Sequence, residues 1–120
     1  MAKTILVVDD DQYIRDLYVE ILEEDGYTVE TAEDGTDALE KIKKTDYDLV
    51  LLDIMMPRMD GIEMLRNLKE AKKTAKVVLL TNLAHDPVMN EGKELGALDY
   101  IIKADMTPDQ LVEKLKTYLK

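Results

Sequence analysis

Four short apolar runs in this 120-residue chain each end on a polar side chain that can take part in chemistry. The runs and the residues that follow them are 5–8 with Asp9, 49–52 with Asp53, 77–80 with Thr81, and 100–102 with Lys103. Stretches with the 3.6-residue apolar periodicity of helices lie between these runs. Strands that alternate with helices are typical of βαβ units, whose parallel strands are joined by right-handed crossovers. The alternation therefore predicts an α/β fold built on one parallel sheet.

The pattern assigns an element to almost every part of the chain. The expected strands span residues 4–8, 28–32, 49–52, 76–80 and 100–102, and the expected helices span 12–24, 36–44, 62–72, 108–119 and a stretch within 87–95. Asp11 and Thr107 are suited to cap helix N-termini, and Gly26 and Gly96 to end helices in the left-handed conformation. Helices on both faces of the sheet favour a doubly wound, flavodoxin-like (βα)5 fold of strand order 2-1-3-4-5. We expect a single domain over residues 1–120.

The composition argues against several classes of protein. Lys and Arg number 16 against 26 Asp and Glu, and the net charge of −10 argues against direct nucleic-acid binding. The chain has no cysteine, so disulfides and thiolate metal sites are excluded. No apolar stretch approaches the ~18 residues of a membrane span, and no signal-peptide pattern occurs. We therefore expect a cytoplasmic protein with no membrane insertion.

Asp9, Asp10 and Asp53 are expected to lie together. In an open parallel sheet the carboxyl ends of the strands border the crevice where ligands bind, and the switch point falls between the first and third strands. Clustered carboxylates suit a hard divalent cation such as Mg²⁺. A carboxylate beside a metal ion, with Thr81 and Lys103 at neighbouring strand ends, suits phosphoryl chemistry. The sequence therefore predicts a magnesium-dependent phosphoryl site at this edge of the sheet.

Four motifs occur in order along the chain, each at the expected end of a strand. They are Asp9-Asp10, the segment 53–61 (DIMMPRMDG), the segment 79–81 (LLT) and the segment 99–103 (DYIIK). Together they resemble the receiver domain of bacterial two-component response regulators, and most of all its stand-alone CheY-like type. The resemblance covers the whole chain. It implies a signalling phosphoacceptor that assists only its own phosphoryl transfer and autodephosphorylation.

The resemblance also implies roles for the acidic residues. Asp53 would accept a phosphoryl group from a phosphohistidine on a sensor histidine kinase. Asp10 would hold Mg²⁺ directly, and Asp9 would support it directly or through water. Asp53 and the backbone carbonyl of Met55 would complete the protein ligands.

Three further residues take roles from the same resemblance. Lys103 would pair with the phosphoryl oxygens, and Thr81 would donate a hydrogen bond to one of them. Tyr100 would turn inward as Thr81 moves, and so switch a protein-binding face made of the fourth helix, fifth strand and fifth helix. The implied partners are a sensor kinase and a downstream protein target, with the chain a monomer or a phosphorylation-dependent dimer. A phosphorelay intermediate or phosphate sink that serves a histidine phosphotransferase remains open, because it would use the same pocket.

Two other classes of protein share parts of this pattern. Phosphatases of the haloacid-dehalogenase type need a second aspartate two residues after the nucleophile, where this chain has Met55. A flavin-binding electron carrier of the same strand order would need small hydroxyl and glycine residues in the first loop. The three aspartates at 9–11 would instead repel the flavin phosphate. Both classes are therefore disfavoured.

Several positions depart from the usual family pattern. Ala104 follows Lys103 where proline is usual, and we expect a trans bond between them because a cis non-proline bond costs about 3–4 kcal/mol. Met55 and Leu83 are apolar and offer no group to orient a hydrolytic water, so we expect a long-lived phosphorylated state. Gly92 falls inside the expected fourth helix and predicts that this helix is short or labile.

Overall fold

The computed structural model describes residues 3–54, 61–72, 75–81, 86–102 and 107–119 of the chain. Within these ranges, five parallel strands form one sheet of order β2-β1-β3-β4-β5. The strands are β1 (Thr4–Val8), β2 (Thr28–Ala32), β3 (Leu49–Asp53), β4 (Val77–Thr81) and β5 (Asp99–Ile102). The helices are α1 (Gln12–Glu24), α2 (Gly35–Lys44), α3 (Gly61–Glu70), α4 (Asp86–Glu94) and α5 (Pro108–Tyr118). The predicted flavodoxin-like order is confirmed.

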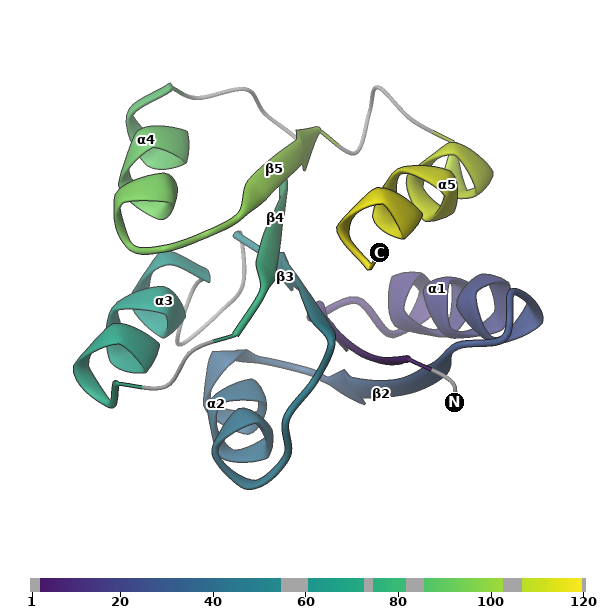
Figure 1. Cartoon of the computed structure of the whole chain (residues 1–120), viewed down its shortest axis with the longest axis horizontal. Helices are drawn as coiled ribbons and strands as arrows, with labels where there is room; N and C mark the ends of the chain where they lie inside the picture. Colours follow the sequence, from purple (N-terminus) through teal and green to yellow (C-terminus); the bar gives the residue numbers. More distant parts are fainter. Residues whose placement is uncertain (1–2, 55–60, 73–74, 82–85, 103–106, 120) are drawn as a thin grey trace.

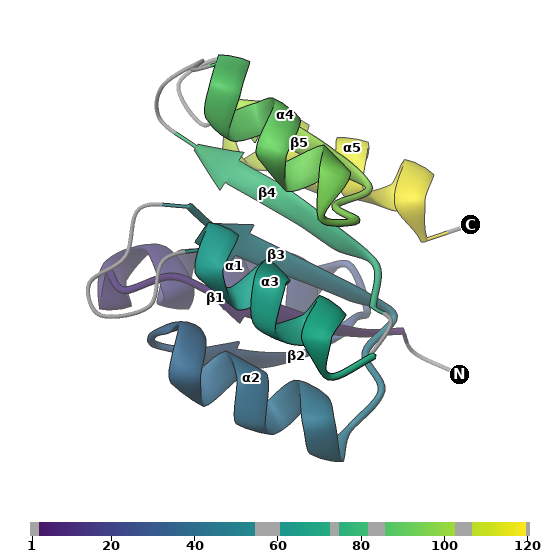
Figure 2. The same cartoon turned by 90° about the vertical axis from the view of Figure 1, so that its left-hand side faces the viewer.

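Helices cover both faces of the sheet. α1 and α5 lie on one face, while α2, α3 and α4 lie on the other (Figure 1), and the turned view shows the same two layers (Figure 2). Alternate strand residues serve the two layers because successive side chains of a strand point to opposite faces. Leu6 and Val8 pack with residues of α2 and α3, whereas Ile5 and Val7 pack with residues of α1 and α5. β3 and β4 are buried along their whole length, as their continuous apolar sequence predicts.

The predicted helix ends are confirmed where local chemistry specifies them. The Asp11 carboxylate accepts hydrogen bonds from two backbone N–H groups in the first turn of α1. Gly26 and Gly96 follow α1 and α4 with φ of +91° and +106°, the left-handed region that glycine enters without a β-carbon penalty. Thr107 and Gln110 form a reciprocal capping box at the start of α5. These ends need no long-range contact, which is why the sequence alone predicts them.

β3 and β4 each extend one residue beyond the predicted strand end. Asp53 lies opposite Leu80, and Thr81 lies opposite Ile102, so parallel pairing continues to the polar residue itself. Asp53 and Thr81 are therefore the last residues of buried strands rather than the first residues of loops. Strand hydrogen bonding holds their backbones in place.

Gly92 has a packing role in α4 that the sequence did not reveal. A β-carbon at this position would collide with the buried side chain of Leu79 on β4 and would lie 3.5 Å from Cδ1 of Ile62 on α3. The glycine therefore lets α4 lie close against both neighbouring elements. Glycine is less favourable than alanine inside a helix, and α4 bears this cost at the position where it packs closely.

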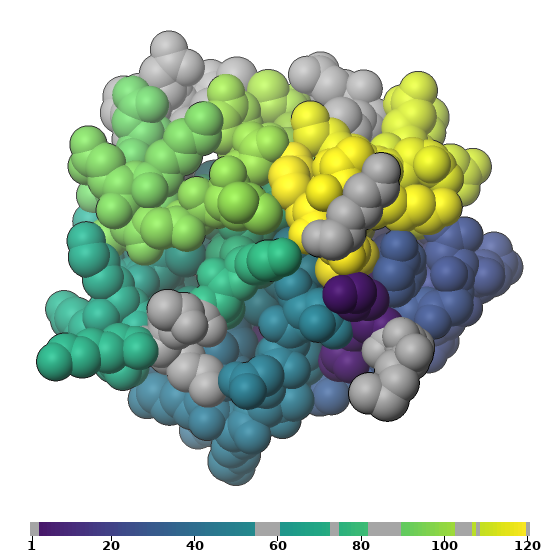
Figure 3. All heavy atoms as spheres, in the orientation of Figure 1, coloured from purple at the N-terminus to yellow at the C-terminus, as the bar shows by residue number. Residues whose placement is uncertain are grey.

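The two ends of the described chain lie at the edge of the sheet where the strands begin. Lys3, Asp48 and Leu119 line one hollow of about 380 Å³ there. The space-filling view shows the N-terminal residues beside α5 (Figure 3). The opposite edge, where the strands end, is the one that carries the acidic residues. None of the helices in the described ranges is long and apolar enough to cross a lipid bilayer.

Candidate functional site

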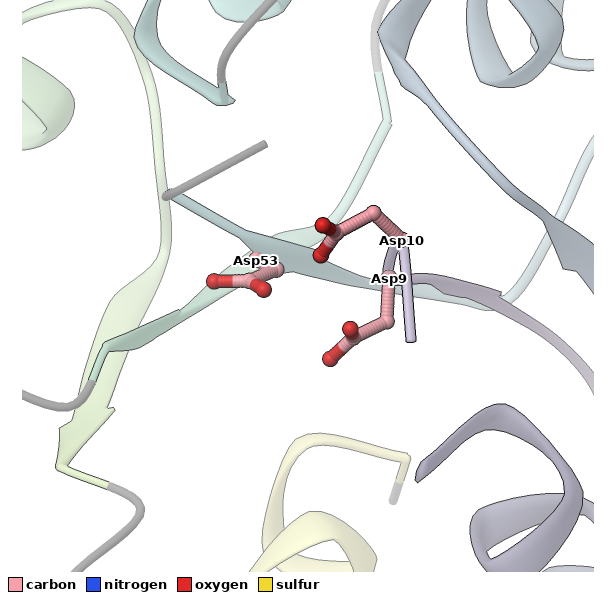
Figure 4. Close-up of side chains that lie close together, drawn as sticks. All are labelled: Asp9, Asp10 and Asp53. Carbon is pink, nitrogen blue, oxygen red and sulfur yellow. The ribbon is translucent and has the colours of Figure 1, made fainter. Parts of the chain in front are cut away.

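Three carboxylates meet at the edge where β1 and β3 end. Val8 lies opposite Leu52 in the ladder, so Asp9 and Asp53, the next residue on each strand, come side by side. Asp9, Asp10 and Asp53 each offer an oxygen, and these oxygens lie within 4.8 Å of one another. Figure 4 shows the three side chains directed toward a common space. β1 pairs with β2 on one side and β3 on the other, so the cluster occupies the predicted switch point.

The chemistry of this cluster suits a divalent cation. Asp9 and Asp53 are 1% and 6% exposed, while Asp10 is exposed to solvent. Two like charges at such a separation repel each other by a few kcal/mol where water is partly excluded. A hard cation with a preference for carboxylate oxygens removes that repulsion, and Mg²⁺ meets this description while retaining several of its waters. The residues present therefore fit a magnesium ion bound by several protein oxygens and water.

Hydrogen bonds hold both the backbone and the side chain of Asp9. Its N–H donates to the carbonyl of Ala32 on β2 over 3.2 Å. One of its carboxylate oxygens accepts the N–H of Asp11 over 3.0 Å, and its carbonyl accepts Nη1 of Arg15 over 2.6 Å. The first two contacts follow from the strand and the helix cap. Arg15 was not predicted from the sequence, where its only signal is a cation close to a helix N-terminus.

Asp53 depends on a close approach of α3. The backbone N–H of Ile54 continues the ladder to the carbonyl of Leu80 over 3.0 Å, and the N–H of Gly61 donates to the carbonyl of Ile54 over 3.1 Å. A β-carbon on Gly61 would lie 2.8 Å from the carbonyl oxygen of Asp53. The absence of a side chain on Gly61 lets the start of α3 touch the backbone of the strand that carries Asp53.

Thr81 and Tyr100 project from the same face of the sheet. Tyr100 lies opposite Leu79 in the ladder between β4 and β5, and Leu79 shares a strand face with Thr81 because the two are separated by one residue. Thr81 is 5% exposed, and Tyr100 is half-buried within the cluster that includes Leu79. Nζ of Lys93 on α4 lies 5.0 Å from the centre of the Tyr100 ring. This register places Tyr100 next to the strand end that carries Thr81.

A hydrogen bond between β5 and α5 lies at the opposite edge of the sheet, where β5 begins. The hydroxyl of Tyr118 donates to Oδ2 of Asp99 over 2.6 Å. Burial raises the pKa of Asp99, but hydrogen bonds from Tyr118 and from a backbone N–H lower the pKa overall. Burial, and then the bond to Asp99, raises the pKa of Tyr118 above its usual value. The pair joins a helix to the edge strand of the sheet.

Several predicted positions lie outside the described residues. They are Met55, Leu83, Lys103 and Ala104. Three expectations therefore stay predictions. They are metal binding by the Met55 carbonyl, pairing of the Lys103 ammonium with the phosphoryl oxygens, and a trans bond between Lys103 and Ala104. Of the predicted site residues that are described, Asp9, Asp10 and Asp53 come together, and Thr81 ends the strand next to Asp53.

Comparison with known proteins matches nearly the whole chain. A family model described as the response regulator receiver domain matches residues 5–116. The chain is 40% identical over 108 residues to chemotaxis protein CheY of Halobacterium salinarum, covering 90% of each protein. It is 38% identical over 119 residues to sporulation initiation phosphotransferase F of Bacillus subtilis, covering 99% of this chain and 95% of that protein.

One similar protein is much longer than this chain. Transcriptional regulatory protein ResD of Bacillus subtilis is 40% identical over 116 residues, which cover 97% of this chain but 48% of ResD. The chain thus spans about half the length of that relative.

Solved structures agree with the fold. A CheY-like receiver domain protein from Methanospirillum hungatei is 36% identical with a TM-score of 0.90, covering 99% of this chain and 94% of that one. TrrA from Thermotoga maritima, in complex with Mg²⁺ and BeF, is 43% identical with a TM-score of 0.84, covering 98% and 99%. With this fold, the acidic cluster and the match over residues 5–116, the chain belongs to the response regulator receiver domain family.

Proposed function

We propose that Asp53 is the phosphoacceptor of a single receiver domain spanning residues 1–120. The observation that carries the proposal is the grouping of Asp53 with Asp9 and Asp10, whose carboxylate oxygens lie within 4.8 Å of one another. An Asp53 oxygen attacks the phosphorus of a phosphohistidine on a sensor histidine kinase. The new O–P bond forms as the P–N bond breaks, and the electron pair of that bond returns to the imidazole. Strand pairing through β3 holds the attacking residue in place during this exchange.

The proposal assigns the metal ligands as well. They are the carboxylates of Asp9, Asp10 and Asp53 and the backbone carbonyl of Met55. Magnesium bound there supplies positive charge against the oxygens of the transferring group, the main requirement of phosphoryl transfer. Lys103 follows β5 and supplies a second, mobile positive charge to the same oxygens. Support comes from the donor set and from the similar protein TrrA, which was solved with Mg²⁺ and BeF.

Phosphorylation then acts on the face formed by α4, β5 and α5. Thr81 donates its hydroxyl to a phosphoryl oxygen, and Tyr100 turns inward into the space this movement leaves. The shared sheet face of Thr81, Leu79 and Tyr100 supports this coupling. The output is binding to a downstream protein target, by a monomer or a phosphorylation-dependent dimer in the cytoplasm.

A second candidate is a phosphorelay intermediate or phosphate sink. The similarity to sporulation initiation phosphotransferase F over 95% of that protein favours it. Asp53 would then pass its phosphoryl group on to a histidine phosphotransferase. The test is whether a labelled phosphoryl group passes from the phosphorylated chain to a purified histidine phosphotransferase domain. Such transfer separates this candidate from a switch that acts only by protein binding.

The first test is intact mass spectrometry after incubation with acetyl phosphate and Mg²⁺. The wild-type chain should gain one phosphoryl group, and Asp53→Asn should gain none because the amide is not a nucleophile of this kind. Asp16→Asn, which changes an exposed carboxylate on α1, is the matched control and should behave as wild type. EDTA should abolish the gain. A wild-type chain that stays unmodified, or an Asp53→Asn variant that is modified equally, would contradict the proposal.

A further inference from the structure

Arg15 reaches from α1 back to the junction between β1 and the helix. Its Nη1 donates a 2.6 Å hydrogen bond to the carbonyl oxygen of Asp9, six residues earlier in the chain. Helical side chains lean toward the helix N-terminus, which allows this long side chain to reach past the Asp11 cap. Arg15 is half-buried. The contact joins the helix to the first carboxylate residue of the acidic cluster.

The position of this arginine is unfavourable for the helix itself. The N-terminal end of a helix dipole is positive and favours acidic side chains over cations. Asp9 is 1% exposed, so its carbonyl oxygen needs a donor from the protein. Arg15 supplies that donor. Residues that break a local structural preference are expected at functional sites. Arg15 breaks the preference of the helix dipole and lies next to the buried carboxylates.

We propose that Arg15 is a positioning residue for the magnesium site. By holding the carbonyl of Asp9, it fixes the direction in which the Asp9 carboxylate faces Asp10 and Asp53. The inference rests on the proposed function, because it requires that these three residues bind Mg²⁺. The N–H of Asp9 is tied to β2, and one carboxylate oxygen is tied to the N–H of Asp11, so Arg15 completes the restraint on this residue.

A positioning role and a simple charge effect predict opposite changes in metal affinity. The guanidinium is a positive charge close to the cluster, so its removal by charge alone would strengthen the binding of a cation. Loss of the restraint would weaken binding, and residues that orient metal ligands typically contribute about 10–100-fold to affinity. The sign of the change therefore separates the two explanations.

The experiment measures the dissociation constant for Mg²⁺ alone by isothermal titration calorimetry on the full chain. The variants are Arg15→Ala and Arg15→Lys, and Arg66→Ala is the matched control. Arg66 lies on α3 and pairs with Glu91 on α4, so Arg66→Ala removes the same charge and a surface ion pair away from the cluster. Circular dichroism in metal-free buffer establishes that each variant is folded before titration. The NMR resonance of the Asp11 backbone amide reports independently on the hydrogen bond from that amide to the Asp9 carboxylate.

We expect Arg15→Ala to weaken Mg²⁺ binding about 10–100-fold and to shift the Asp11 resonance. Arg15→Lys should recover part of the affinity, because an ammonium group can donate to the same carbonyl. Arg66→Ala should match wild type. Binding by Arg15→Ala as tight as wild type, or tighter, would overturn the positioning role and leave the proposed function standing. A wild-type chain that takes up no Mg²⁺ would overturn both.

Discussion

At the scale of single residues, the candidate site depends on neighbours that carry no reacting group. Asp9 keeps its place through Ala32, Asp11 and Arg15. Asp53 keeps its place through the ladder to β4 and through Gly61, whose missing side chain allows α3 to approach the strand end. The acidic residues are visible in the sequence as a motif. The restraints on them are contacts between separate segments.

Gly61→Ala should lower both stability and magnesium affinity. A β-carbon would lie 2.8 Å from the backbone carbonyl oxygen of Asp53, and backbone cannot move aside as a flexible side chain can. We expect the free energy of unfolding to fall by about 1–3 kcal/mol, as for other overpacked positions. Urea denaturation and calorimetric titration with Mg²⁺ measure the two effects.

Gly26→Ala is the control for the Gly61 prediction. Its φ of +91° disfavours alanine, but no atom lies within 4 Å of the added carbon. It should cost about 1 kcal/mol through backbone strain and leave Mg²⁺ affinity unchanged. Equal Mg²⁺ affinity in both glycine variants would contradict the role assigned to Gly61.

At the scale of elements, two side-chain contacts join α4 and α5 to β5, the strand between them in the face formed by α4, β5 and α5. Lys93 of α4 lies over the ring of Tyr100 on β5, and Tyr118 of α5 donates to Asp99 on β5. β5 is an edge strand that pairs only with β4 among the described strands. Its attachment to the helices therefore relies on these side-chain contacts and on apolar packing.

Tyr118→Phe should destabilise the chain by about 1 kcal/mol near neutral pH, because Asp99 loses a hydrogen bond to its charged form. The folded-state pKa of Asp99 is lowered, so the contribution of this bond is present above the unfolded pKa and is lost as pH falls through the folded pKa. The folded-state pKa of Tyr118 is raised, so the contribution is also lost at strongly alkaline pH. The stability difference should be constant around neutral pH and shrink toward both extremes.

Chemical denaturation at a series of pH values measures that difference. Tyr47→Phe is the control, because it removes an exposed hydroxyl bond to Glu30 on β2, the outermost strand on the side of the sheet away from β5. Burial, followed by the bond to Glu30, raises the pKa of Tyr47 to about 12. Exposed hydrogen bonds to a carboxylate contribute little to stability. Tyr47→Phe should therefore lower the free energy of unfolding by much less than Tyr118→Phe does. A larger loss in Tyr47→Phe would argue against the anchoring role of Tyr118.

At the scale of the whole molecule, the fold concentrates negative charge at one edge of the sheet. The chain has a net charge of −10, and two of the three clustered carboxylates are nearly inaccessible to water. Buried like charges oppose folding unless a cation or a proton neutralises them. The stability of the entire domain should therefore respond to magnesium.

Millimolar Mg²⁺ should raise the melting temperature of the wild-type chain. At ten to one hundred times the dissociation constant, binding to the folded state alone stabilises it by about 1.4–2.7 kcal/mol. Asp53→Asn should melt higher than wild type in metal-free buffer, because it removes one of the repelling charges, and should respond less to Mg²⁺. Differential scanning calorimetry measures both effects, with NaCl of equal ionic strength as the control for screening. A wild-type melting temperature that is indifferent to Mg²⁺ would remove the main support for the acidic site.

The alternation of elements, the helix caps at Asp11 and Thr107, and the choice of Asp9, Asp10 and Asp53 could all be predicted from the sequence. Apolar periodicity, capping and strand-end position are local properties, so they can be read along the chain. Three contacts could not be predicted in this way. They are those of Gly61 with the Asp53 backbone, of Gly92 with Leu79, and of Arg15 with the Asp9 carbonyl. Each depends on the distance between segments that packing brings together, and no local pattern in the sequence encodes that distance.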